Sequence, residues 1–155
     1  MPLDAICLRA VLHELRPQLI GARIDKVQQP ARDQIVLLLR GNLRLLLNAG
    51  ANQPRIQLTN ILRDNPAQPP MFCMLLRKHV TNATITDVWQ MPYERVVDFA
   101  LLVNDDLGYR KEMHLVFELT GKTSNIILTD ENHVTLDSIK HLPQDLDSTR
   151  IIMAG

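Results

Sequence analysis

The sequence predicts an α+β domain that is mostly β, a β-sandwich-like fold with one helix at the N-terminus and one near the centre. Three observations lead to this class. Two segments have the apolar spacing of helices, and the remaining apolar residues fall in short runs separated by turn residues. The chain has 155 residues, of which 46% are apolar, and this is enough to bury one core in a single domain.

The first helix is expected over residues 3–20, where apolar side chains recur at spacings of three and four. Asp4 is a residue type that caps helices, Pro17 is expected to end or kink the helix, and Gly21 closes the segment. Four strand-like runs follow, at residues 23–29, 34–40, 43–49 and 55–58.

The second and third of these runs form a predicted β-hairpin. Gly41-Asn42 between them is a two-residue turn signal, because both residue types tolerate positive φ angles. Residues 35–39 are apolar at every position, which predicts a central strand covered on both faces. Residues 59–70 contain three prolines together with asparagine and aspartate, so we expect an irregular surface crossing there.

The second predicted helix opens at Pro69-Pro70 and ends with the basic residues Arg77-Lys78-His79. Proline suits a first helical turn because its missing amide hydrogen would have no partner there, and cations suit the negative end of the helix dipole. We interpret the segment as a buried helix with a solvated basic end. Five further strand-like runs follow, at residues 84–90, 95–103, 112–119, 125–129 and 134–139.

The net charge is zero, but the charges are divided unevenly along the chain. Residues 1–80 hold 11 Lys and Arg against 5 Asp and Glu, a net +6, and residues 81–155 hold 6 against 12, a net −6. Either the two halves attract each other in the fold, or the first half presents a basic face to phosphate groups. A neutral chain argues against strong nonspecific nucleic-acid binding by this domain alone.

Composition also bounds the cellular setting. No run of about 18 apolar residues is present to span a membrane, and the start of the chain lacks the features of a secretory signal. We therefore expect a cytoplasmic protein without membrane contact. Cys7 and Cys73 both lie in predicted helices, and we expect buried free thiols rather than a disulfide.

Patterns typical of cofactor binding and catalysis are weak. Gly121-Lys122-Thr123 matches the last three positions of a phosphate-binding loop. Val116 stands where that loop needs its first glycine, and a strand-like run follows where it needs a helix. We predict a tight turn with Lys122 exposed. The five histidines have no short spacing to one another or to the cysteines, so no zinc or iron site is expected. The sequence also has no Gly-x-Ser-x-Gly motif.

Tyr93-Glu94-Arg95 lies between a predicted turn and a predicted strand. An aromatic ring, an acid and an arginine at a strand edge can read nucleobases, the arginine by stacking or paired hydrogen bonds and the acid by accepting from a ring amine. The alternative is a surface ion pair worth roughly 0–1 kcal/mol, and the spacing by itself favours that alternative.

Two blocks of sequence are more specific than the rest, residues 69–79 (PPMFCMLLRKH) and residues 124–128 (SNIIL). Further segments of the same kind are Leu3-Asp4, residues 21–27, Gln29-Pro30, Pro54-Arg55-Ile56, Asn65-Pro66 and residues 137–140. From residue 2 to about residue 153, this pattern resembles the N-terminal domain of the NFACT family. That family includes RqcH, proteins labelled fibronectin-binding protein A, and eukaryotic NEMF.

The resemblance implies an NFACT N-terminal domain over residues 1–142. Residues 143–155 would begin a linker to helix-hairpin-helix and coiled-coil regions that this sequence does not contain. The implied function is that of a ribosome quality-control factor. Such a factor binds the large ribosomal subunit with a stalled nascent chain, recruits alanyl-tRNA and supports alanine tailing.

In the family, this domain helps grip the tRNA anticodon arm, and an Asp-Arg pair is tied to tRNA recognition. The matching positions here are Glu94 and Arg95. The acid is one methylene longer than the family's, so the arginine's role carries over better than that of the acid. Glu118 and Lys122 are second candidates for tRNA contact.

The family's fold also resembles that of formamidopyrimidine-type DNA glycosylases, in which an N-terminal proline amine is the nucleophile and a glutamate follows directly. Pro2 matches, but Leu3 follows it and Asp4 is displaced by one position, so the proton donor for base excision is missing. We therefore expect no enzymatic activity and no cofactor. Two alternatives remain: a glycosylase-like enzyme, and a surface adhesin with fibronectin as its partner.

Overall fold

The computed structural model describes residues 5–50, 54–59, 68–92, 94–104, 107–120 and 123–140. Within these residues the chain forms two helices and nine strands, and their bounds agree closely with the predicted segments. In chain order they are α1 (Ala5–Leu19), β1 (Ile24–Ala31), β2 (Gln34–Leu39), β3 (Leu43–Asn48), β4 (Arg55–Leu58), α2 (Met71–Val80), β5 (Thr84–Gln90), β6 (Val96–Asn104), β7 (Arg110–Glu118), β8 (Asn125–Thr129) and β9 (Thr135–Ser138).

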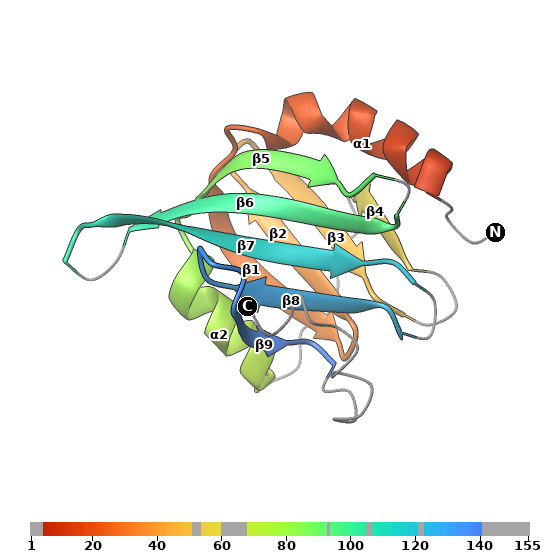
Figure 1. Cartoon of the computed structure of the whole chain (residues 1–155). Coiled ribbons are helices and arrows are strands. Elements are labelled where there is room, and N and C mark those ends of the chain that lie inside the picture. Colours follow the sequence, from red (N-terminus) through yellow and green to blue (C-terminus); the bar gives the residue numbers. More distant parts are fainter. Residues whose placement is uncertain are drawn as a thin grey trace.

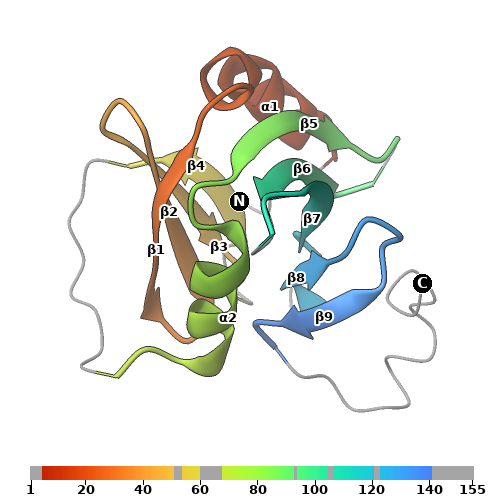
Figure 2. The ribbon, with the colours of Figure 1, turned by 90° about the vertical axis from the view of Figure 1, so that its left-hand side faces the viewer.

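The strands form two antiparallel sheets that face each other (Figure 1). One sheet has four strands in the order β1-β2-β3-β4, and the other has five in the order β5-β6-β7-β8-β9. Helix α2 contacts β1 of the first sheet and both β6 and β9 of the second, while α1 packs against β5 (Figure 2). This arrangement confirms the predicted mostly β, sandwich-like α+β class, and the place of β2 between β1 and β3 confirms that it is a central strand.

One large apolar cluster lies between the sheets and beneath both helices. Side chains alternate faces along a strand, so Val97, Phe99 and Leu101 of β6 all point inward and are fully buried. The buried residues of α1 follow helical spacing and are Leu8, Leu12, Leu15 and Leu19. Burying each large apolar side chain stabilises the fold by about 1.5–3 kcal/mol. Neither described helix combines the length and apolar character needed to cross a bilayer.

Two predictions about the backbone have different outcomes. Gly41 and Asn42 have the predicted positive φ angles, 94° and 67°, and with Arg40 they join β2 to β3, one residue more than the predicted two-residue turn. Pro17, in contrast, does not end α1, which continues beyond it. The missing proline amide falls in the last turn, where the amide of Ile20 still donates to the carbonyl of Arg16 over 2.9 Å.

Hydrogen bonds join the two sheets where β1 and β5 begin. The amide of Gly21 donates to the carbonyl of Ile85 over 2.7 Å, and the amide of Ile85 donates to the carbonyl of Ala22 over 2.9 Å. A second link lies beyond β3 and β9, where Nζ of Lys140 donates to the carbonyl of Ala49 over 2.6 Å. These bonds join the two sheets at the margin of the apolar cluster, to which Ile85 and Ala49 belong.

Neither cysteine forms a disulfide, as expected, but only Cys73 is buried. Cys7 is exposed because the buried face of α1 runs through Leu8 and Leu12, and position 7 lies outside it. The expectation that both thiols are buried is therefore wrong for Cys7. The Sγ atom of Cys73 lies 3.8 Å from the carbonyl oxygen of Val27, beneath α2.

We predict that a maleimide alkylates Cys7 of the native protein at least about tenfold faster than Cys73. The thiolate is the reactive form, and burial raises the pKa of the Cys73 thiol. Timed labelling at neutral pH followed by peptide mass spectrometry measures both rates, which should converge in concentrated urea. Equal rates in the native protein would mean that α2 does not enclose Cys73.

Candidate nucleic-acid interface

The turn between β5 and β6 carries Glu94 and Arg95 at one end of the five-stranded sheet. The amide of Met91 donates to the carbonyl of Val96 over 3.0 Å and closes the turn. Within it, the amide of Glu94 donates to the carbonyl of Met91 over 3.1 Å. Glu94 is exposed and Arg95 is partly exposed, so the core does not enclose the arginine.

Two further contacts fix the backbone of this turn. The carbonyl of Arg95 accepts a hydrogen bond from the amide of Leu119 over 2.8 Å, which ties the turn to the end of β7. Nε2 of Gln90 donates both to the carbonyl of Glu94 over 2.7 Å and to the carbonyl of Ala5 over 3.0 Å. The Gln90 side chain therefore connects β5, the turn and the first residue of α1. A turn held in this way loses little further backbone entropy when its side chains bind a partner.

The other predicted contact residues are placed less favourably or lie outside the described residues. Glu118 is the last residue of β7, paired in register with Val96 and Asn125, and it is only 2% exposed. An RNA could touch its carboxylate only after neighbouring side chains moved, so its contact stays a prediction. Lys122 and Tyr93 lie outside the described residues.

The uneven charge distribution has two visible consequences. Arg16 of the basic half and Asp87 of the acidic half form an ion pair of 3.3 Å, although both side chains are about half exposed and such pairs contribute little. Positive charge also gathers where the end of α2 approaches the start of β7. There, burial lowers the pKa of His79, and Lys111 and Lys78 lower it further. The Arg16–Asp87 pair is a contact between the two halves, whereas Lys111 belongs to the acidic half, so a basic face formed by the first half stays a prediction.

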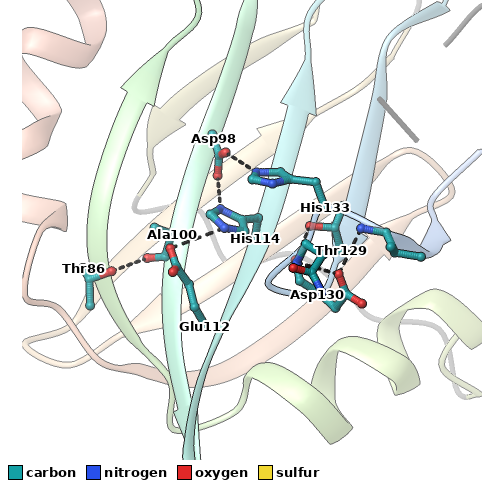
Figure 3. Close-up of polar contacts among 10 residues, drawn as sticks. Thr86, Asp98, Ala100, Glu112, His114, Thr129, Asp130 and His133 are labelled. Carbon is teal, nitrogen blue, oxygen red and sulfur yellow. Dashed lines mark hydrogen bonds and ion pairs between the residues drawn. The ribbon is translucent and has the colours of Figure 1, made fainter. Parts of the chain in front are cut away.

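A second polar cluster lies on the outer face of the same sheet, formed by Asp98, His114 and His133 (Figure 3). Their ligand atoms all lie within 4.8 Å of one another, so these three residues could hold a metal ion. Sequence spacing missed them, because His114 and His133 stand 16 and 35 positions from Asp98. The available signal was Asp98 itself, the one charged residue in the otherwise apolar run 96–103.

Comparison with known proteins finds a family model and curated relatives. The model for the NFACT N-terminal and middle domains matches residues 4–155. The chain is 35% identical over 159 residues to the Rqc2 homolog RqcH of Bacillus subtilis, covering all of this chain and 28% of that protein. It is 30% identical over 150 residues to the ribosome quality control complex subunit NEMF of Homo sapiens, covering 95% of this chain and 13% of that protein. The chain thus spans less than a third of the length of these relatives.

Solved structures of similar fold include the N-terminal part of the fibronectin/fibrinogen-binding protein FBPS of Streptococcus suis. That structure has a TM-score of 0.91 and 36% sequence identity, covering 98% of this chain and 58% of the other. The N-terminal domain of the fibronectin-binding protein PavA of Streptococcus pneumoniae has a TM-score of 0.87 and 38% identity, covering 91% and 55%. The similarity therefore extends over nearly the whole fold.

We predict that Gln90→Ala loosens the β5–β6 turn. Two backbone carbonyls lose their donor, at about 0.5–1.5 kcal/mol each, so the amides of Met91 and Glu94 should exchange with deuterium about 5- to 150-fold faster. Hydrogen exchange followed by mass spectrometry measures this in the peptide that spans the turn. Gln18→Ala on the exposed face of α1 is the matched control and should leave the peptide unchanged. Unchanged exchange in the Gln90 variant would show that this side chain does not hold the turn.

Proposed function

This chain belongs to the NFACT family, and we propose that it is the RNA-contacting N-terminal part of a ribosome quality-control factor. Relatives named RqcH and NEMF support the ribosome quality-control role. The matched share of those relatives is 28% and 13%, so the activity of the whole protein belongs to the proposal.

The observation that carries the proposal is the position of Arg95. It stands in a turn at the end of a sheet, its backbone bonded to Leu119, with part of its side chain at the surface and the exposed Glu94 beside it. A guanidinium offers a planar fork of donors that matches the paired acceptors of a base edge or a phosphate. A neighbouring carboxylate can accept from a base amine. The pair suits an unstacked RNA loop, where base edges are accessible.

In its specific form, the proposal is that the RNA is tRNA, with alanyl-tRNA bound best. The bound tRNA would serve alanine tailing of a stalled nascent chain on the large ribosomal subunit. In this scheme the chain binds and positions RNA, and we assign no catalytic role to any described residue. A globally neutral domain binds RNA weakly without specific contacts, which places the selectivity on a few side chains such as Arg95.

A second candidate function is binding of fibronectin. It rests on the high similarity to FBPS and PavA, whose names describe fibronectin binding by those proteins. Binding assays with tRNA and with fibronectin on the same full-length protein separate the two. Saturable fibronectin binding together with no affinity for tRNA would favour the adhesin.

We predict that Arg95→Ala weakens the affinity of the full-length protein for alanyl-tRNA by at least several-fold, because a base or phosphate contact contributes roughly 1–3 kcal/mol. Arg95→Lys, which keeps the charge but loses the fork, should recover only part of the loss. Filter binding or fluorescence anisotropy at a fixed salt concentration measures the affinities.

Arg110→Ala is the matched control for charge. Arg110 is exposed and is paired in register with Asn104, the last residue of β6, whereas Val96 is the first residue of that strand. Eight residue steps along that strand correspond to about 26 Å. An equal loss of affinity in both variants would mean that net charge alone is sensed, and an unchanged affinity in Arg95→Ala would remove Arg95 from the site.

A further inference from the structure

The cluster of Asp98, His114 and His133 is built around one buried carboxylate (Figure 3). Oδ1 of Asp98 lies 2.8 Å from Nδ1 of His114, and Oδ2 lies 3.3 Å from Nε2 of His133. The side chain of Asp98 is 2% exposed and that of His114 is 8% exposed, whereas that of His133 is 48% exposed. Asp98 and His114 are therefore enclosed within the sheet, and His133 lies at the surface.

Strand register brings the first two residues together. Asp98 is paired with Val116 and His114 with Ala100, so Asp98 and His114 are diagonal neighbours on β6 and β7. Both belong to the face opposite the inward-pointing Phe99, because side chains alternate along a strand. The two ligands are thus positioned by the same burial that holds the sheet in register.

The turn after β8 delivers the third ligand. Oδ1 of Asp130 accepts hydrogen bonds from the amides of Asn132 over 2.8 Å and Val134 over 3.0 Å, and the amide of His133 donates to the carbonyl of Asp130 over 3.0 Å. His133 has a φ angle of 63°, in the left-handed region that non-glycine residues rarely adopt. In this conformation, the ring of His133 stacks on the ring of His114, and the two ring centroids are 4.0 Å apart.

We propose that Asp98, His114 and His133 bind one zinc ion, with the fourth coordination position open to solvent. Two imidazole nitrogens and one carboxylate oxygen form a donor set typical of zinc sites with an open position. A divalent ion would take the place of the hydrogen bonds between these atoms and would neutralise a carboxylate buried at a cost in solvation. Oε1 of Glu112 lies 3.3 Å from Nε2 of His114 and would accept a hydrogen bond from that N–H group when Nδ1 binds the ion.

Coordination requires a small movement of His133. Two ligand atoms that each lie about 2.0–2.1 Å from one ion are at most about 4.2 Å apart, and the present atoms lie within 4.8 Å of one another. The lone pairs of an imidazole lie in its ring plane, and the two stacked rings are inclined by only 24°, so they do not point to a common position. The half-exposed ring of His133 can turn to close the site, and the 2.8 Å between Oδ1 of Asp98 and Nδ1 of His114 would open to about 3.3–3.4 Å in a tetrahedral site.

The test is a metal titration of the full-length protein after treatment with a chelator and transfer to chelator-free buffer. Isothermal titration calorimetry with Zn²⁺ compares the wild type with His133→Asn and with His13→Ala. Asparagine tolerates the left-handed backbone at position 133 but is too short to reach the ion. His13 is an exposed histidine of α1 and serves as the matched control. Titration with Co²⁺, followed by visible absorption, reports the coordination geometry.

The wild type and His13→Ala should each bind one Zn²⁺ per chain with the same affinity. His133→Asn should bind Zn²⁺ at least about tenfold more weakly. The Co²⁺ spectrum of the wild type should indicate a four-coordinate site that the His133 variant lacks. Equal stoichiometry and affinity in the wild type and His133→Asn would overturn the proposal, as would the absence of zinc uptake by the wild type. The outcome is independent of the tRNA measurements, because neither Arg95 nor Glu94 belongs to this cluster.

Discussion

The inner faces of two antiparallel sheets bury one apolar cluster, and this shared burial decides where every polar group of the fold can lie. Along β6, the side chains of Val97 and Phe99 lie in the core, so that of Asp98 lies on the opposite face of the sheet. Arg95 directly precedes the first residue of this strand. A slip of one residue in register would exchange these faces and turn the carboxylate of Asp98 toward the apolar cluster. The candidate RNA contact and two of the proposed zinc ligands, Asp98 and His114, thus depend on the same pairing of β6 with β7.

Local structure was largely predictable because its causes are local. The bounds of β4, β5 and β8 coincide with the predicted runs, since apolar stretches ended by turn residues leave a signal within a few positions. Contacts between distant segments leave no such signal. The hydrogen bonds between Gly21 and Ile85 could not be predicted, and the sequence left open whether Pro17 ends α1 or only kinks it.

The candidate site likewise has features that the sequence predicted and features that it did not. Arg95 was singled out by family resemblance, since the spacing of Tyr93-Glu94-Arg95 favours an ordinary surface pair. The bonds from Gln90 that hold the turn cross from β5 to α1 and have no sequence signature. The burial of Glu118 was also hidden, because the outer face of this sheet carries a small apolar cluster of its own, formed by Val96, Val116 and Ile127.

The central claim is that the β5–β6 turn meets tRNA, and site-specific photo-crosslinking tests it most directly. A photoreactive amino acid replaces the exposed Glu94 in one variant of the full-length protein, and Leu107 in another. Leu107 is 81% exposed in the β6–β7 connection, at the far end of the sheet. The account predicts crosslinks to bound alanyl-tRNA from position 94 and none from position 107. Crosslinks from position 107 alone, with tRNA bound to both variants, would contradict it.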